Sequence, residues 1–194
     1  MNHLLNPALL LATLSLSACS LAPTAPAKAV YDLGPAPVVA PSAALTWRIA
    51  DVTAPPWLAT DGIAYRLLFR EAQRLEHYRD SAWAAPPPAL LTQRLRERIG
   101  LLGACPASPA TLVAVHLDEF EQVFSGPASS RAVLRVHVTL WAGGAVGTGP
   151  QQHWRLERAT APDAAGAVRG LAQAVDDWLP LLSAWLEGSC QKSA

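Results

Sequence analysis

The sequence predicts an α+β protein with a single main domain, in which a largely antiparallel β-sheet carries two main helices on one face. Stretches with alternating apolar and polar residues, typical of half-buried strands, precede each of two stretches with an apolar residue every three or four positions, typical of helices. Short turns join neighbouring strand stretches, which favours hairpins over long parallel crossovers. The chain of 194 residues is long enough for one domain with a substantial core.

An apolar run over residues 4–16 opens the chain and ends in the small residues Ser17 and Ala18 before Cys19. About a dozen residues are too few to cross a bilayer core as a helix, which takes about 20. A short apolar run followed by small residues is typical of a secretory signal peptide. The tetrapeptide Leu16-Ser17-Ala18-Cys19 also resembles a bacterial lipobox, which implies cleavage between Ala18 and Cys19 and acyl chains on Cys19. The alternative is an ordinary signal peptide with an incidental cysteine.

This interpretation divides the chain into three segments. We expect a lipoprotein signal peptide over residues 1–18, a lipidated N-terminus and Ala/Pro-rich tether over 19–43, and the domain itself over 44–194. Within the tether, residues 30–33 are predicted as a short edge strand, and the Pro-rich stretch after it as an extended connector. Two or three acyl chains hold a protein on a membrane where one would not, because each buried methylene contributes about 0.8 kcal/mol.

Three strands and a helix are expected in the first half of the domain. Alternation predicts strands over residues 45–52, 62–69 and 74–78, with a turn at 70–73. A loop over 80–88 leads through three prolines into the helix, since proline suits a first helical turn.

This first helix is expected to run to about Leu102 and to stop at Gly103. Its apolar residues share one face, and its charged residues are expected largely elsewhere on the helix. The apolar set is Leu91, Leu95, Ile99 and Leu102; the charged set is Arg94, Arg96, Glu97 and Arg98.

The second half of the domain is expected to form a three-strand meander followed by a helix. The alternation over residues 111–125 changes phase, and a β-bulge near 118–119 reconciles its two halves. Strands over 132–141 and 152–158 are predicted to pair as a hairpin. The helix over 163–186 is expected to bury one apolar stripe. The residues of this stripe are Val168, Leu171, Val175, Leu179, Leu182 and Leu186.

Charge and cysteine content limit the classes of function. The formal net charge is zero, so the chain offers no basic footprint for nucleic acid and no polybasic patch for anionic lipid. Beyond the signal segment, no stretch is apolar enough to span a bilayer. Cys105 and Cys190 form either a disulfide, as an oxidising compartment permits, or two free thiols.

The residues that usually carry catalysis do not form a recognisable set. The sequence has no Gly-x-Ser-x-Gly, His-Glu-x-x-His or Cys-x-x-Cys motif. Asp118, Glu119 and Glu121 are better explained as an exposed strand face than as an acid–base set. His116 and His137 are expected on neighbouring strands, where two imidazoles without a third ligand make a weak metal site. We therefore predict no catalytic residues, no metal and no cofactor, with His77 and His153 standing alone.

Two of the seven tryptophans, Trp57 and Trp83, lie in Pro-flanked segments predicted as loops. There an amphipathic indole either anchors its loop on the domain or faces a partner, and we expect it to anchor the loop.

Several segments together resemble the ABC-type transport auxiliary lipoproteins, the PqiC/YmbA-like family. The resemblance covers most of the chain after Cys19. The matching segments are Tyr31-Asp32-Leu33-Gly34-Pro35, Pro55-Pro56-Trp57-Leu58, Ile63-Ala64-Tyr65-Arg66, Tyr78-Arg79-Asp80-Ser81-Ala82-Trp83-Ala84-Ala85-Pro86-Pro87, Glu119-Phe120-Glu121-Gln122-Val123-Phe124 and Ser130-Arg131-Ala132.

The resemblance implies a non-catalytic, membrane-anchored lipoprotein of an MCE-type ABC transport system for lipids. Its partners would be an MCE-domain protein with its ABC permease and ATPase, and the family analogy extends to a homo-oligomer. Ser20, in place of the Asp that commonly retains lipoproteins in the inner membrane, favours the periplasmic face of the outer membrane, where the protein would dock the MCE assembly. The alternative function is a periplasmic module that binds a lipid or another hydrophobic ligand.

Overall fold

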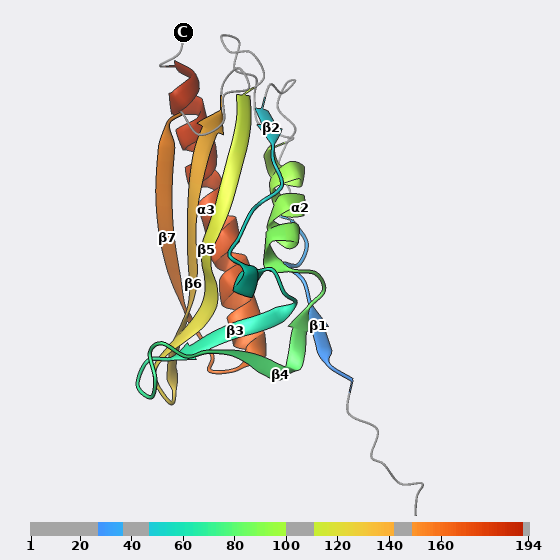
Figure 1. The fold of residues 1–194 in the computed structure, drawn as a ribbon, viewed down its shortest axis with the longest axis vertical. Coiled ribbons are helices and arrows are strands. Elements are labelled where there is room, and N and C mark those ends of the chain that lie inside the picture. The colour runs from blue at the N-terminus through green and yellow to red at the C-terminus, as the bar shows by residue number, and fades with distance from the viewer. Residues whose placement is uncertain (1–26, 37–46, 100–110, 142–148, 192–194) are drawn as a thin grey trace, which may run out of the picture.

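The computed structural model describes residues 27–36, 47–99, 111–141 and 149–191. Within these residues the chain forms seven strands, two α-helices and one 3-10 helix (Figure 1). The strands are β1 (Ala29–Tyr31), β2 (Trp47–Ile49), β3 (Gly62–Leu67), β4 (Leu75–Trp83), β5 (Thr111–Gly126), β6 (Ser129–Trp141) and β7 (Gln151–Thr160). The helices are η1 (Pro56–Leu58), α2 (Pro87–Ile99) and α3 (Ala164–Gln191).

All seven strands belong to one open sheet, built around β5. The order is β1-β4-β3-β5-β6-β7, and β2 pairs with the first residues of β5 on the same side as β3. The hairpins β3–β4, β5–β6 and β6–β7 are antiparallel, whereas β1–β4, β2–β5 and β3–β5 are parallel. The predicted α+β class is confirmed, with a sheet that is mixed rather than largely antiparallel.

The core lies between the sheet and the two helices. The predicted stripe of α3 is buried over its whole length, from Val168 at 8% exposure to Leu186 at 0%. Leu91 and Leu95 of α2 join the same core, together with the inward residues of β6. Burial of each such side chain contributes about 1.5–3 kcal/mol, so this single core accounts for much of the stability of the fold.

β5 contains the predicted bulge. Its register against β6 shifts between Leu117 and Glu119, which leaves Asp118 as the extra residue. Before the shift Val115 and Leu117 point into the core, and after it Phe120 does, at 1% exposure. The bulge thus keeps both halves of a long strand facing the same core.

β4 is longer than expected, and the prediction of a loop from residue 80 was wrong. The strand continues to Trp83 because β1 pairs with its end in parallel, placing Ala29 opposite Ser81 and Tyr31 opposite Trp83. Backbone partners 52 residues earlier in the chain therefore extend the strand, although its sequence does not alternate clearly.

The elongated molecule has two distinct ends (Figure 1). The β3–β4 turn, the β5–β6 turn, the start of α3 and the first described residues before β1 lie at one end. The C-terminal end of α3 lies at the other. Among the described residues, no helix combines the length and apolar character needed to cross a bilayer.

Candidate functional site

Trp57 and Trp83, each predicted to anchor a loop or to face a partner, lie in different environments. Trp57, in η1, is 55% exposed. Trp83, at the end of β4, is 2% exposed and its ring lies 5.5 Å from that of Phe120. A partner-facing role for Trp83 was wrong, because the strand carries its indole into the core; Trp57 alone stays a candidate for contact with a partner.

The predicted lipidation and cleavage residues, Ala18 and Cys19, lie outside the described residues, as does Cys105. Cys190 lies in the last turn of α3 and is disulfide-bonded. The pairing of Cys190 with Cys105 stays a prediction.

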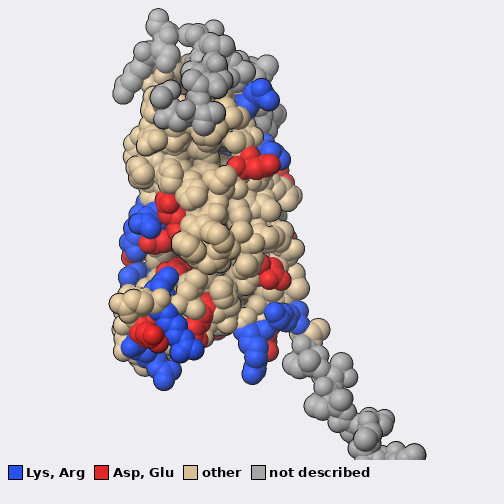
Figure 2. Space-filling view, in the orientation of Figure 1, with Lys and Arg blue, Asp and Glu red and all other residues tan. Residues whose placement is uncertain are grey.

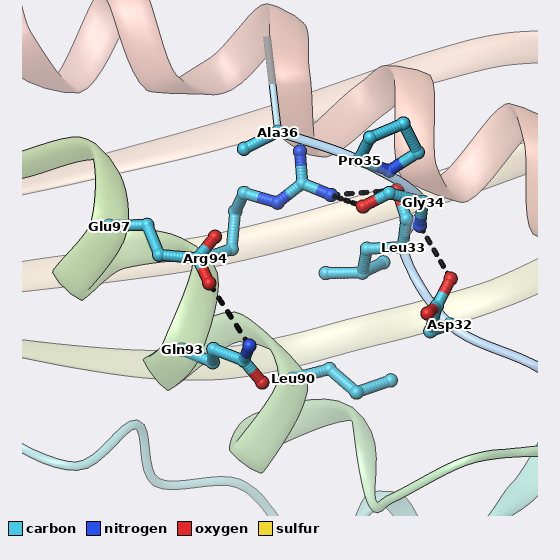
Figure 3. Close-up of a pocket in the computed structure, with 9 residues that line it drawn as sticks. All are labelled: Asp32, Leu33, Gly34, Pro35, Ala36, Leu90, Gln93, Arg94 and Glu97. Carbon is cyan, nitrogen blue, oxygen red and sulfur yellow. Dashed lines mark hydrogen bonds between the residues drawn. The ribbon is translucent and has the colours of Figure 1, made fainter. Parts of the chain in front are cut away.

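Arg94 is a charged residue whose burial the sequence did not predict. Its expected position away from the apolar face was wrong: its side chain is 4% exposed and points between α2, α3 and the N-terminal segment (Figure 3). The guanidinium donates to the carbonyl oxygens of Leu33 at 2.7 Å and Gly34 at 2.6 Å, and to Asp176 Oδ1 at 2.9 Å. Gly34 has a φ of 70°, which glycine adopts without strain, and its N–H donates to Asp32 Oδ1. Arg94 thus fastens the N-terminal segment at Leu33 and Gly34 to α2 and α3.

The carboxyl of Asp176 has a raised pKa. Desolvation by burial raises it most, with Asp177 adding to the effect, and together they outweigh the attraction of the Arg94 guanidinium. This ion pair therefore fixes geometry more than it stabilises charge.

The hollow beside Arg94 has a volume of about 170 Å³. Its lining includes Asp32, Gln93, Arg94 and Glu97, so polar groups border most of it (Figure 3). A larger hollow, of about 590 Å³, lies along α2 and is bordered by Asp51, Thr92 and Arg96. Arg96 and Asp51 form an ion pair at 2.7 Å across it.

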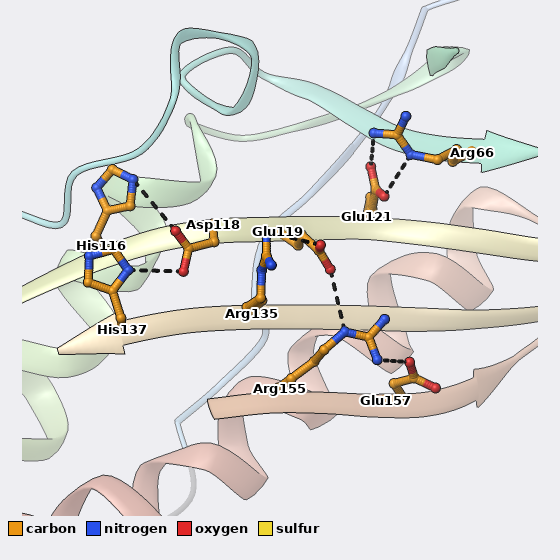
Figure 4. A network of polar contacts seen from close by, with 9 residues as sticks. All are labelled: Arg66, His116, Asp118, Glu119, Glu121, Arg135, His137, Arg155 and Glu157. Carbon is orange, nitrogen blue, oxygen red and sulfur yellow. Dashed lines mark hydrogen bonds and ion pairs between the residues drawn. The ribbon is translucent and has the colours of Figure 1, made fainter. Parts of the chain in front are cut away.

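A row of three imidazoles crosses the face of the sheet that points away from the core. His116, His137 and His153 lie opposite one another on β5, β6 and β7, with ring centroids 4.9 and 5.3 Å apart. Asp118, the bulge residue, accepts from His137 Nδ1 at 3.0 Å and lies 3.9 Å from His116 Nε2 (Figure 4). The expected neighbours His116 and His137 are confirmed, but His153 does not stand alone: the β6–β7 register places it beside them.

A second row of charged residues lies next to the imidazoles. Glu119 forms ion pairs with Arg135 at 3.2 Å and Arg155 at 3.7 Å, and Arg155 pairs in turn with Glu157 (Figure 4). Glu121 is held by Arg66 at 3.0 Å. Glu119 and Glu121 are therefore paired with arginines, whereas Asp118 is paired with His137. The expectation that all three lie on an exposed strand face was wrong for Glu121, which is 7% exposed because Arg66 covers it.

This outer face can present charge but shows no built reaction centre among the described residues. No group of three His, Cys, Asp or Glu residues there is placed to hold a metal ion. Desolvation raises the pKa of Glu157, but hydrogen bonds and charges from Arg155 and Arg131 outweigh it and leave that pKa below its ordinary value. Glu157 is accordingly held in its anionic form, as an ion-pair partner.

A buried amide network that the sequence did not indicate joins the sheet to the start of α3. Gln122 is 0% exposed. Its Nε2 lies 2.7–2.9 Å from three acceptors that share its two hydrogens: Ser130 Oγ, Thr160 Oγ1 and the carbonyl of Ala161. Its Oε1 accepts from the Tyr78 hydroxyl at 2.5 Å. Burial raises the pKa of Tyr78 to about 12. The network satisfies a polar side chain at a core position, as burial requires.

Comparisons with known proteins give the same fold. A protein from Xanthomonas campestris, XCC0632, described under the family model DUF330, superposes with a TM-score of 0.65 at 16% identity, covering 86% of this chain and 95% of its own. An uncharacterized protein of known crystal structure superposes with a TM-score of 0.63 at 18% identity, covering 83% of this chain and 99% of its own. A comparison with curated proteins found no match.

The family model described as "ABC-type transport auxiliary lipoprotein component" matches residues 31–179. The match begins in β1, takes in every strand of the described sheet, and ends within α3. The segment fastened by Arg94 and the core stripe of α3 as far as Leu179 therefore fall inside it. This chain belongs to the family of ABC-type transport auxiliary lipoprotein components.

Proposed function

We propose that this protein is a non-catalytic, lipid-anchored component of an MCE-type ABC transport system for lipids. In this role it docks the MCE assembly at the periplasmic face of the outer membrane. The observation that carries the proposal is the family match over residues 31–179, on a chain whose N-terminus has the form of a lipobox. The family is named as an auxiliary component, which accords with a binding role rather than a catalytic one.

The anchor part of the proposal depends on Cys19. Thioether-linked and amide-linked acyl chains there bury enough methylenes for stable attachment. Metabolic labelling of the full chain with radioactive palmitate is expected to label the wild type and not Cys19→Ala. Cys19→Ala is also expected to leave the fraction that sediments with outer membranes. A Cys19→Ala chain that stays in that fraction would contradict the anchor.

The docking part depends on a protein partner. An affinity-tagged chain, extracted from native membranes in mild detergent, is expected to carry the MCE-domain protein with it. A tagged lipoprotein of another family, expressed at the same level, is the matched control and is expected to carry none. Equal recovery of the MCE protein with both baits, or none with either, argues against the docking role.

The alternative, a carrier of lipid or another hydrophobic ligand, draws support from the size of the hollow along α2. A volume of about 590 Å³ falls within the range of ligand sites. Val52, Pro88 and Ala89 give it largely apolar walls, which suit an acyl chain, but the exposed Arg96–Asp51 ion pair lies at its border and the hollow is open to solvent. Native mass spectrometry of the purified protein decides between them: a co-purified lipid favours the carrier, and its absence favours docking alone.

A further inference from the structure

We propose that the end of the domain that carries the β3–β4 turn rests on the phospholipid surface, with Leu68 and Phe69 entering the headgroup region. We call this the basal end and define it as residues 27–29 together with residues 68–74. The inference rests on the proposed lipid anchor and adds an orientation and a second membrane contact.

The basal end presents an apolar pair on a fixed turn. Leu68 is 40% exposed and Phe69 is 44% exposed, whereas large apolar side chains elsewhere in the described chain are mostly buried. Leu68 N–H donates to the Phe124 carbonyl at 3.0 Å, and Arg70 N–H donates to the Leu67 carbonyl at 3.0 Å. The backbone of the pair is thus held by β5 and by the turn itself, so little ordering is needed before it meets an apolar medium.

The direction of the chain brings the same end toward the lipid anchor. β1 runs parallel to the last three residues of β4, with Ala29 opposite Ser81, and the residues before Ala29 leave the domain at the same end of the molecule as the β3–β4 turn, on its other side (Figure 1). Lys28 lies close enough to Asp80 to help lower the pKa of that carboxyl, after the larger effect of the hydrogen bond from Arg79. The first described residues after the anchor therefore lie at the basal end, beside β4.

The length of the tether excludes the inverted orientation. Eight residue steps separate Cys19 from Ala27, a span of at most about 26–29 Å. α3 begins at the basal end and runs for 28 residues, about 42 Å, to the opposite end (Figure 1). A domain standing on that opposite end would lift Ala27 about 40 Å from the bilayer, farther than the tether reaches.

Cations at the basal end match a phosphate surface. Figure 2 shows that most Lys and Arg side chains on the viewed face lie in its lower half, interspersed with Asp and Glu. Arg74 of the basal end has a side chain 62% exposed, and Arg79, which lies on β4 outside it, has one 90% exposed; each is beside a carboxylate. Arg70, directly after Phe69, forms no ion pair with any described residue. Guanidinium groups next to an apolar pair suit the headgroup boundary, where one end of the contact is apolar and the other meets phosphate.

The contact is too small to hold the protein on a membrane alone. Two apolar side chains and a nearly balanced set of charges give weak attachment, but the tether keeps the basal end at a high effective concentration near the lipid. The contact therefore determines the orientation of the domain relative to the bilayer, while the acyl chains on Cys19 determine whether the protein is attached.

Site-specific photo-crosslinking tests this orientation. The full-length lipidated protein is placed in vesicles of phosphatidylethanolamine and phosphatidylglycerol, with p-benzoylphenylalanine in place of Phe69. The matched control carries the same group in place of Leu181, which is 46% exposed and lies about 25 Å along α3 from its start. We expect phospholipid adducts at position 69 at least tenfold above those at position 181. Equal yields at the two positions, or adducts at 69 to a second copy of the chain, would overturn the proposal.

A double variant separates this inference from the anchor. Leu68→Gln with Phe69→Gln is expected to incorporate palmitate and sediment with membranes as the wild type does. In vesicles, the amides of its β3–β4 turn are expected to exchange hydrogen at least threefold faster than in the wild type; without vesicles the two rates are expected to agree. Normal palmitate incorporation with no lipid adduct at position 69 would contradict the proposed orientation but not the lipid anchor. Failure of the wild type to incorporate palmitate would contradict the lipid anchor on Cys19.

Discussion

The Arg94 guanidinium lies 2.9 Å from the Asp176 carboxylate and joins α2 to α3 at the point where the N-terminal segment enters the domain. Because its side chain is 4% exposed, removing it leaves two backbone carbonyls and a carboxylate without their donor. Arg94→Ala is therefore expected to lower the free energy of unfolding by about 2–3 kcal/mol. Arg94→Lys keeps the charge but loses the planar guanidinium that donates to several acceptors at once. Its stability should therefore lie between that of the wild type and that of Arg94→Ala. Urea unfolding measures all three chains; a change below about 0.5 kcal/mol for Arg94→Ala would contradict the fastening role.

The two tryptophans give a second prediction, since one is buried and the other is not. Trp83→Ala removes a core side chain and is expected to destabilise the fold by about 3–5 kcal/mol. Trp57→Ala is expected to change stability by no more than about 0.5 kcal/mol. If Trp57 faces a partner, its variant should recover less MCE protein in the affinity experiment at unchanged thermal stability. A large loss of stability in Trp57→Ala would show that it anchors its segment instead.

Two glycines of α3 form a matched pair. A Cβ at Gly170 would lie 2.3 Å from Thr160 Cγ2 and 2.9 Å from Ala132 Cβ, whereas a Cβ at Gly188 meets nothing within 4 Å. Gly170→Ala is expected to destabilise by about 1–3 kcal/mol, because α3 must move away from the sheet. Gly188→Ala is expected to leave stability unchanged or to raise it by up to about 1 kcal/mol, since alanine favours the helix. Similar effects of the two substitutions in thermal unfolding would contradict the close approach at Gly170.

Tyr78 predicts how stability depends on alkaline pH. Burial raises its pKa in the folded state to about 12, above the ordinary value of 10. Its contribution is therefore fully present below pH 10 and is lost as the pH rises from 10 to 12. Tyr78→Phe should lower stability by about 1–2 kcal/mol at pH 8, because Gln122 Oε1 loses its donor, and should weaken the further decline above pH 10. Urea unfolding at pH 8, 10 and 11 measures the free energy of unfolding of the wild type and of Tyr78→Phe. An equal loss of stability above pH 10 in the two proteins would contradict the role of Tyr78.

The disulfide gives the last prediction. If Cys105 and Cys190 are paired, alkylation of the denatured, unreduced protein should label neither thiol, and mass spectrometry should find both labelled only after reduction. Loss of a bridge that closes a loop of about 85 residues would lower stability by about 4 kcal/mol in Cys105→Ser with Cys190→Ser. Labelling of both thiols without reductant would rule the pairing out.

Elements with local causes were predictable from sequence, and elements set by distant contacts were not. The apolar spacing from Val168 to Leu186 specified the buried face of α3, and the phase change around Asp118 specified the bulge. Each of these depends on the order of neighbouring residues alone.

The remaining features depend on partners far along the chain. The sequence predicts Arg94 on the surface of a helix. It is buried instead because it donates to the carbonyl of Leu33, 61 positions earlier in the chain. β4 extends to Trp83 because β1 pairs with it, and His153 joins the imidazole row through the β6–β7 register. No local pattern encodes these contacts, and for the same reason the candidate site was less predictable than the fold.

The length of α3 has a consequence for assembly. With the basal end on the bilayer, its 28 residues place the opposite end about 4 nm above the lipid phosphates. The domain would then act as a spacer of set height, and a partner bound at its top would have to bridge that gap before any cargo could reach the leaflet.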